Sequence, residues 1–184
     1  ETVLETADFV CIGEYEYAAL DLIQGKDPKT IPGVYPNERG ELLDINSLPF
    51  PEDNDVSRLD YHEPNCQYRQ IQMYASRGCP RRCNFCAAAT LYYDELNWRP
   101  RQIKSVVDEI KYLSEKYPEM EGIFFDEEVH NIRSDFNIGL AQAIKAEGLD
   151  HLKYEAMCEY ISLDKNALKE MKEAGYYKIR FGIE

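Results

Sequence analysis

Three cysteines stand within eight residues of this 184-residue chain, at Cys79, Cys83 and Cys86. Their pattern is Cys-x-x-x-Cys-x-x-Cys, and they lie in the stretch 77–89. Three thiols this close together cannot all pair with one another as disulfides, and their thiolates are the ligands that zinc and iron–sulfur clusters take. The spacing therefore predicts one metal centre bound by this short stretch.

Two metal centres fit such a trio. Structural zinc takes four ligands, usually as two separated pairs, so it would need Cys66 or His62, which lie 13 or more residues upstream of Cys79. A [4Fe–4S] cluster also takes four ligands, and three cysteines would leave one iron open to another molecule. The compact spacing favours the cluster. Zinc stays the alternative, and a trio that binds no metal is the remaining one.

Carboxylates follow the apolar runs further along the chain. Five of them stand at the end of a predicted strand: Asp126, Glu127 and Glu128, then Glu159, and finally Glu184. In parallel α/β folds the carboxyl ends of the strands meet at one edge of the sheet, and functional groups gather there. We therefore expect these side chains to lie near the cysteines. Simpler interpretations are a charge preference at a helix start for 126–128 and a solvated strand end for Glu159.

The elements that must position these residues alternate from residue 71 onward. The expected strands are 71–75, 122–125, 152–158 and 177–181, and the expected helices are 102–117, 135–147 and 164–174. Asp164 is placed to cap the last helix and Gly175 to end it. This alternation predicts an α/β fold with a parallel sheet and right-handed crossovers. We expect 70–184 to be the first half of a larger (β/α) barrel. We expect the 184-residue piece alone to be inactive and either poorly soluble or partly unfolded.

The residues before the barrel divide into two segments. In 1–45, a short buried strand (8–12) precedes Gly13 and an apolar-periodic helix that stops at Gly25, and 31–35 with 42–45 could form a hairpin. One such unit is not a domain, so we expect the C-terminal part of one. Segment 46–69 is rich in proline, which excludes a helix interior or a central strand around 48–51, and we interpret it as a linker that packs through Leu48 and Phe50.

The composition limits the class of protein. A net charge of −13 argues against a general nucleic-acid-binding surface. There is no run of about 20 apolar residues to form a transmembrane helix, and the opening residues lack the basic-then-apolar order of a signal peptide. Six cysteines, three of them clustered, fit a reducing compartment better than a disulfide framework. We therefore expect a cytoplasmic protein.

A local positive patch surrounds the cysteines in this acidic chain. Its members are Arg77, Arg81, Arg82, Arg99 and Arg101. Such a patch predicts a site for an anionic ligand or cluster, and a solvated basic loop is the alternative.

Together these motifs resemble the radical S-adenosylmethionine (SAM) enzymes. The resemblance rests on the cysteine pattern after a first strand, on Phe85 before the last cysteine, on the acidic end of the second strand and on Gly182-Ile-Glu184. The preceding stretches 7–16, 31–33 and 48–51 resemble the tail and linker of the cobalamin-binding subgroup. There they close a Rossmann-like cobalamin-binding domain, although Tyr15 stands where a glycine is usual.

The resemblance implies a cluster and a reaction class. Cys79, Cys83 and Cys86 would hold a [4Fe–4S] cluster whose open iron binds the amino and carboxylate groups of SAM. An electron from a donor such as flavodoxin or ferredoxin would cleave SAM to a 5′-deoxyadenosyl radical, for C–H activation, methyl transfer or cyclisation of a small-molecule substrate. Cobalamin is a further expected cofactor, and the absence of its Asp-x-His-x-x-Gly lower-ligand motif decides nothing.

The same resemblance implies how SAM is bound. Phe85 would pack beside the adenine, and Asp126 and Glu127 would face the methionine ammonium, which needs a carboxylate partner in a site of low dielectric constant. Glu159 and Glu184 would contact the ribose hydroxyls. The contrasting hypothesis is a zinc-stabilised α/β binding module without catalysis.

Overall fold

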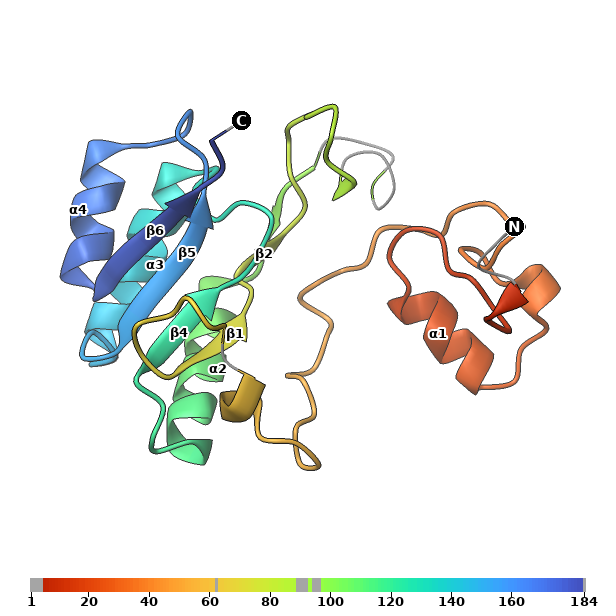
Figure 1. Cartoon of the computed structure of the whole chain (residues 1–184), viewed down its shortest axis with the longest axis horizontal. Coiled ribbons are helices and arrows are strands. Elements are labelled where there is room, and N and C mark those ends of the chain that lie inside the picture. The colour runs from red at the N-terminus through yellow and green to blue at the C-terminus, as the bar shows by residue number, and fades with distance from the viewer. Residues whose placement is uncertain (1–4, 62, 89–92, 94–96, 184) are drawn as a thin grey trace. The chain divides into compact units, whose positions relative to one another are not determined.

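The computed structural model describes residues 5–61, 63–88, 93 and 97–183. The chain divides into two compact units, shown in Figure 1. One comprises Glu1–Ile45 with Cys79–Asn97, and the other comprises Asn46–Gly78 with Trp98–Glu184. No helix in the described ranges is long and apolar enough to cross a membrane.

A four-stranded parallel sheet forms the centre of the second unit. Its strands are β1 (Gln70–Met73), β4 (Gly122–Phe125), β5 (Lys153–Cys158) and β6 (Tyr176–Phe181), in the spatial order β1-β4-β5-β6. All four strands of the expected parallel sheet are therefore present, with bounds within two residues of those predicted. The α/β class is confirmed, and the sheet has the order of a partial barrel.

Three helices cover one face of this sheet, namely α2 (Ile103–Lys116), α3 (Ser134–Ala146) and α4 (Lys165–Glu173) (Figure 1). Each helix follows one strand and precedes the next, as a parallel crossover requires. Their apolar stripes pack against alternate strand residues in one core. This core includes Ile71, Ile110, Phe125, Leu140 and Tyr154, each 0% exposed. Burial of these side chains supplies most of the driving force for folding of the unit.

The ends of α4 show the predicted stop signals. The Asp164 carboxylate accepts hydrogen bonds from the backbone N–H groups of Asn166 (3.0 Å) and Ala167 (2.9 Å), which satisfies donors that the helix leaves unpaired. Gly175 follows the helix with φ of 101°, a conformation that side chains with a Cβ rarely adopt. Both predictions are confirmed.

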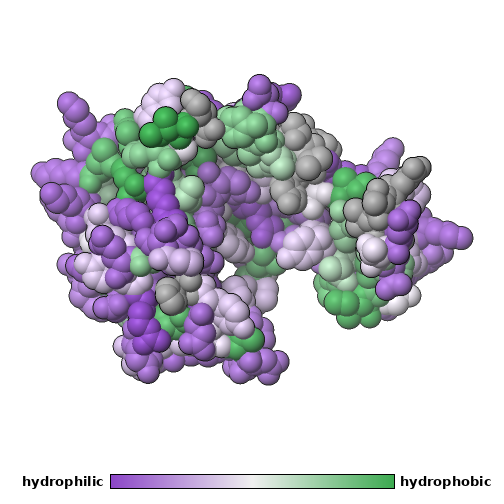
Figure 2. Space-filling view, viewed as in Figure 1, coloured by the Kyte–Doolittle hydropathy of each residue, from purple (hydrophilic) through white to green (hydrophobic). Residues whose placement is uncertain are grey.

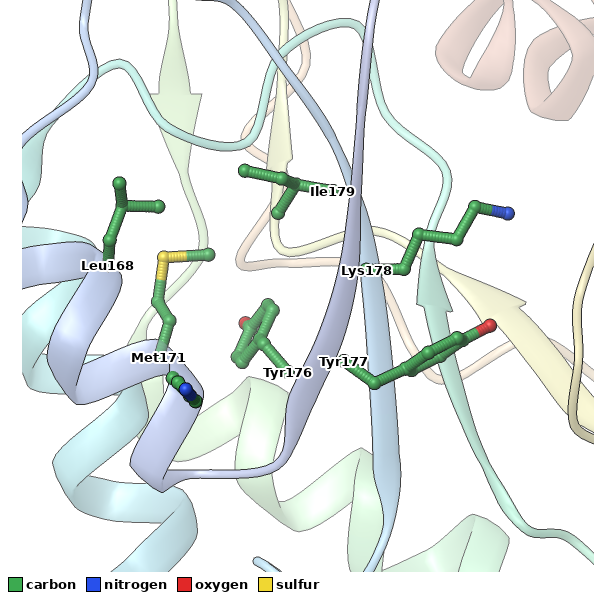
Figure 3. Close-up of a pocket in the computed structure, with 7 residues that line it drawn as sticks. Leu168, Met171, Tyr176, Tyr177, Lys178 and Ile179 are labelled. Carbon is green, nitrogen blue, oxygen red and sulfur yellow. The ribbon is translucent and has the colours of Figure 1, made fainter.

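The other face of the sheet is polar where β5 and β6 meet. The Glu155 side chain is 0% exposed, accepts a hydrogen bond from Tyr177 Oη (2.6 Å) and pairs with Lys178 Nζ (2.9 Å) and with Arg180 Nε. A β-bulge shifts the register here, because Tyr154 pairs with Tyr176 whereas Glu155 pairs with Lys178. Figure 3 shows the result, with Tyr177 and Lys178 on the same side of β6. The bulge thus brings two donors to one buried carboxylate.

The segment expected to be a linker packs on α2. The Phe50 ring lies 5.8 Å from that of Tyr112, which confirms packing through Phe50. Asp53 is a buried residue, 4% exposed. Its carboxylate accepts a hydrogen bond from Tyr117 Oη (2.8 Å) and pairs with Lys116. A short 3₁₀-helix, η3 (Arg58–Tyr61), follows before β1. These contacts hold the segment against the helix.

The N-terminal segment has less regular structure than expected. Helix α1 (Glu16–Ile23) forms and ends before Gly25, as predicted. A 3₁₀-helix, η2 (Pro28–Thr30), follows it, and Ala18, Ile31 and Val34 form a small core.

Two predictions for the N-terminal segment were wrong. Residues 8–12 form no buried strand, only a single antiparallel bridge between Cys11 and Val34. The hairpin of 31–35 with 42–45 is absent from the described residues, and Leu43 N donates to the Glu14 carboxylate (2.7 Å). A strand needs a neighbouring strand to satisfy its backbone groups, and the described residues of this segment offer only the bridge at Val34.

The surface reflects the acidic composition. Figure 2 shows mostly hydrophilic residues on the viewed face. Exposed apolar side chains occur in the loop after β5, where Tyr160 is 71% and Ile161 61% exposed, and also at the end of β6. They lie at the carboxyl end of the sheet, where the candidate site also lies.

Candidate active site

The cysteine stretch leaves the sheet through a two-stranded stem. After β1, strand β2 (Ser76–Arg77) pairs antiparallel with β3 (Arg99–Pro100). Arg101 N donates to Ala75 O (2.8 Å) and extends this pairing by one step. The sequence had indicated a strand that leads straight into the cysteines. The stem was missed because strands of two residues carry no hydrophobic periodicity.

The three cysteines lie on the loop that this stem carries. Cys79 and Cys86 are half-buried, Cys83 is exposed, and none of them is in a disulfide. Cys86 N donates to Cys83 O (3.1 Å), so a tight turn joins the last two. Within the described ranges, no three His, Cys, Asp or Glu side chains converge as a metal-binding group. As a donor set, three reduced thiols on one short loop fit the sulfur ligands of a [4Fe–4S] cluster.

The acidic segment Asp126–Glu128 lies against the stem. Asp126 N donates to Met73 O (3.0 Å), which sets the end of β4 beside the end of β1. Glu127 Oε2 accepts hydrogen bonds from Ala75 N (2.7 Å) and Ser76 N (2.5 Å). Glu128 Oε2 accepts one from Gly78 N (3.1 Å). Two carboxylates thus bind the backbone amides of three residues, Ala75, Ser76 and Gly78, just before Cys79.

A cavity of about 340 Å³ opens at this junction. Its lining is made of Tyr74, Ser76, Arg77, Asp126, Glu127 and Glu128. Asp126 is exposed there, whereas the Glu127 side chain is 1% exposed. Desolvation raises the pKa of the Asp126 carboxyl above its ordinary value, and the charges of Glu63 and Glu127 add to this, while Arg180 opposes it. A cation bound next to Asp126 would relieve that unfavourable charge.

The remaining predicted residues are placed as follows. Glu159 lies beside the acidic segment, because Asn131 donates to Glu159 O (2.8 Å) and accepts from Glu159 N (2.7 Å). Its carboxylate accepts a hydrogen bond from Ser162. Phe85 is 64% exposed on the cysteine loop. Glu184 and His62 lie outside the described residues.

Arg101, a member of the arginine patch, has a structural role. Arg101 is 7% exposed, its guanidinium pairs with the buried Glu109 (2.6 Å) and it also donates to Tyr74 O (2.9 Å). This arginine therefore fixes the start of α2 and is not available to an anionic ligand.

A second cavity lies at the opposite end of β6. It measures about 290 Å³ and is lined by residues of α4 and β6, among them Met171 and Tyr176 (Figure 3). Its charged side chains are lysines, and no carboxylate lines it. It lacks the acidic groups that distinguish the first cavity.

Residues 73–184 match the radical SAM superfamily, so the chain belongs to this superfamily of enzymes. The match runs from the last residue of β1 through β6 and includes the cysteine loop and the acidic segment. Membership brings the cofactors that define the superfamily, a [4Fe–4S] cluster and SAM.

Three curated relatives are methyl-transferring enzymes. An uncharacterised methyltransferase of Pyrococcus horikoshii is 27% identical and covers 96% of this chain. The cytidylyl-2-hydroxyethylphosphonate methyltransferase of Streptomyces wedmorensis is 28% identical over 77% of it, and the hopanoid C-3 methylase of Methylococcus capsulatus is 27% identical over 59%. The chain spans 40%, 27% and 20% of the lengths of these proteins.

Solved structures share the fold over nearly the whole chain. The radical SAM methyltransferase TsrM of Kitasatospora setae, solved with tryptophan and a SAM analogue, matches with a TM-score of 0.75 at 17% identity, over 95% of this chain and 37% of its own. TsrM with cobalamin and a [4Fe–4S] cluster matches with a TM-score of 0.69. The resemblance to the cobalamin-associated subgroup is thereby confirmed at the level of fold.

Proposed function

We propose that the protein is a radical SAM methyltransferase of the cobalamin-associated subgroup that modifies a small molecule. The curated relatives support methyl transfer. The observation that carries the proposal is the attachment of the acidic segment to the stem of the cysteine loop, through Glu127 and Glu128. That attachment brings carboxylates to the entrance of a thiol-bearing loop.

Cys79, Cys83 and Cys86 would hold the cluster. Their thiols are outside disulfides, and a turn joins Cys83 to Cys86. When bound, the cluster supplies the electron for reductive cleavage of SAM, and cobalamin would supply a carrier for the methyl group. An electron donor such as flavodoxin or ferredoxin and a cytoplasmic location belong to the same proposal.

Asp126 would bind the methionine ammonium of SAM. Its carboxyl faces the cavity, whereas Glu127 is occupied with the backbone of the stem. A partly desolvated carboxylate next to an ammonium makes a charge-assisted hydrogen bond, which is stronger than a neutral one. Glu127 would then act indirectly, by holding the strand end that carries Ser76. Phe85 would pack beside the adenine, and Glu159 and Glu184 would contact the ribose.

The cluster assignment is tested by anaerobic reconstitution with iron and sulfide. Serine replacements of Cys79, Cys83 and Cys86 are compared with the same change at Cys11, a cysteine of the N-terminal segment. We expect each of the first three to lose the brown chromophore and bound iron, and Cys11→Ser to retain both. A colourless wild-type protein that carries zinc would contradict the proposal.

The role of Asp126 is tested by SAM affinity. Loss of a hydrogen bond to a charged group costs about 1.5–3 kcal/mol, which is a weakening of about 10-fold to 150-fold. We expect Asp126→Asn to weaken SAM binding to this extent, measured by calorimetry on the reconstituted protein. The control is Asp135→Asn, on an exposed carboxylate paired with Arg133. Equal affinities of the two variants would remove Asp126 from the SAM site.

A further inference from the structure

A buried histidine lies directly behind the acidic segment. His130 is 0% exposed, and its ring stacks on Phe125 with the centroids 4.7 Å apart. Its backbone is also fixed, because His130 N donates to Met157 O (2.7 Å) and Asn137 Nδ2 donates to His130 O (3.2 Å). A fully buried imidazole must have partners for both ring nitrogens.

Both nitrogens have a partner. Nδ1 lies 2.5 Å from Glu127 Oε1, and Nε2 lies 3.0 Å from Tyr176 Oη. A carboxylate only accepts, so Nδ1 carries the hydrogen and donates to Glu127. In the neutral ring Nε2 then accepts the hydrogen of the Tyr176 hydroxyl. The three side chains form one chain of hydrogen bonds from the start of β6 to the loop after β4.

Glu127 connects His130 to the backbone of the stem. One of its oxygens is held by His130 and the other accepts the backbone N–H groups of Ala75 and Ser76. A carboxylate bound on both oxygens has one allowed orientation, and the two amides are fixed with it. Without His130, Oε1 would be a buried acceptor that has lost its donor, so the carboxylate would rotate or take up water.

The same loop also holds the returning side of the stem. Trp98 Nε1 donates to Val129 O (2.9 Å), one residue before His130. On the outgoing side, Gly78 N donates to Glu128 (3.1 Å), and Cys79 follows Gly78 in the chain. Residues 127–130 thus bind both strands of the stem at the points where the cysteine loop begins and ends.

We propose that His130 is a positioning residue that, through Glu127, fixes the stem from which the cysteine loop leaves the barrel. Its ring is 0% exposed, so the proposed role is structural and involves no contact with substrate or cofactor. Its effect is to keep the backbone before Cys79 in one conformation. The inference depends on the proposed function only where a cluster is measured, so its first test uses cluster-free protein.

The first test is amide hydrogen exchange of the protein without a cluster. His130→Phe keeps an aromatic ring on Phe125 and removes both ring nitrogens. His130→Gln restores a donor for Glu127. The matched control is His151→Phe, because His151 is exposed and its ring contacts the backbone oxygen of Gly148, within its own turn.

We expect His130→Phe to speed exchange at Ala75, Ser76 and Gly78 by at least about 10-fold, the factor that corresponds to about 1.4 kcal/mol. His130→Gln should give an intermediate rate and His151→Phe no change. Unchanged exchange at 75–78, or an equal acceleration at β5 and at the stem, would overturn the proposal, because the latter indicates general destabilisation. Should His130→Phe fail to fold, the comparison of His130→Gln with His151→Phe decides.

The second test is the electron paramagnetic resonance spectrum of the reduced, reconstituted protein. A stem that varies in conformation should broaden or shift the cluster signal in His130→Phe, with partial recovery in His130→Gln. Identical spectra in these variants and the wild type would overturn the effect on the loop. If the wild type takes up no iron, the proposed function fails while the exchange result still stands.

Discussion

Replacement of Glu155 by glutamine should strongly destabilise the second compact unit, Asn46–Gly78 with Trp98–Glu184, which we call the barrel unit. The Glu155 carboxylate is buried on the polar face of the sheet with Tyr177, Lys178 and Arg180 as partners. Glutamine keeps the shape and one acceptor oxygen, but it removes the charge and turns an N–H group toward donors. The cations around it would then lose their principal counter-charge.

The size of this effect follows from what each partner retains. Removing one member of a buried ion pair costs about 3–5 kcal/mol. Arg180 keeps its contact with Glu63 (2.9 Å), and Lys178 still donates to Asn65 O (3.0 Å). The side chains of Lys178 and Arg180 are also 32% and 20% exposed, so solvent screens part of the interaction. The lower limit, about 3 kcal/mol, is therefore expected, a fall in Tm of about 6–12 °C for a chain of this size.

The assay can use the single tryptophan of the chain. Trp98 lies in the barrel unit, donates to Val129 O and packs edge-on against Phe136 at 5.5 Å. Its fluorescence therefore reports unfolding of this unit during a urea or thermal titration. The control is Glu173→Gln, the same change at an exposed carboxylate paired with Lys145 (3.1 Å), for which we expect no measurable shift.

The contribution of Glu155 to stability should depend on pH in a definite direction. Burial alone would raise the pKa of Glu155, but hydrogen bonds from Tyr177, Lys178 and Arg180 outweigh it and lower the pKa below its ordinary 4.5. Because the pKa of Glu155 is lowered in the folded state, its ionised carboxylate stabilises the fold above pH 4.5. This contribution is lost as the pH falls through the pKa of the folded state. The difference between wild type and Glu155→Gln should be full at pH 7 and shrink below pH 4.5. A midpoint for Glu155→Gln equal to that of Glu173→Gln at pH 7 would refute the reasoning.

Three further changes test the packing of the barrel unit, each by the same fluorescence titration. Gly122→Ala would place a Cβ 1.9 Å from the Lys153 carbonyl oxygen and should cost about 1–3 kcal/mol or more, whereas Gly139→Ala in α3 should cost less because it meets only a flexible side-chain tip. Equal losses would contradict the close approach of β4 and β5. Asp164→Ala removes the cap of α4 and should cost about 1 kcal/mol, with Asp164→Asn close to wild type. Leu140→Ala, at a position 0% exposed, should cost about 2–5 kcal/mol, and a smaller loss would mean that the core collapses around the cavity.

The barrel unit was predictable because its signals are long and periodic. Strand 122–125 was predicted with the bounds that the structure gives, and α2 was predicted within one residue at each end. Apolar runs between helices with strong stripes leave few alternatives for a chain of this length. The placement of Asp126–Glu128 at a strand end followed directly from that alternation.

Other features had no local signal. The sequence around residues 8–12 is apolar enough for a strand, but no neighbouring strand within the described residues pairs with it beyond the bridge at Val34. Likewise, nothing in the spacing of Glu127 and His130 shows that both side chains turn inward. Their pairing depends on the position of Tyr176, 46 residues further along. Only the assembled sheet brings these groups together.

The β-bulge in β6 has a consequence for the evolution of this sheet. Because Tyr176 pairs with Tyr154 and Lys178 with Glu155, Tyr177 is an extra residue that the ladder does not need. Removing it would leave Lys178, Ile179 and Arg180 in register with β5. Length differences of one residue among related sequences should therefore be tolerated at this position of the strand. Sequences that lack the extra residue would keep the sheet but lose the hydroxyl that Tyr177 donates to Glu155.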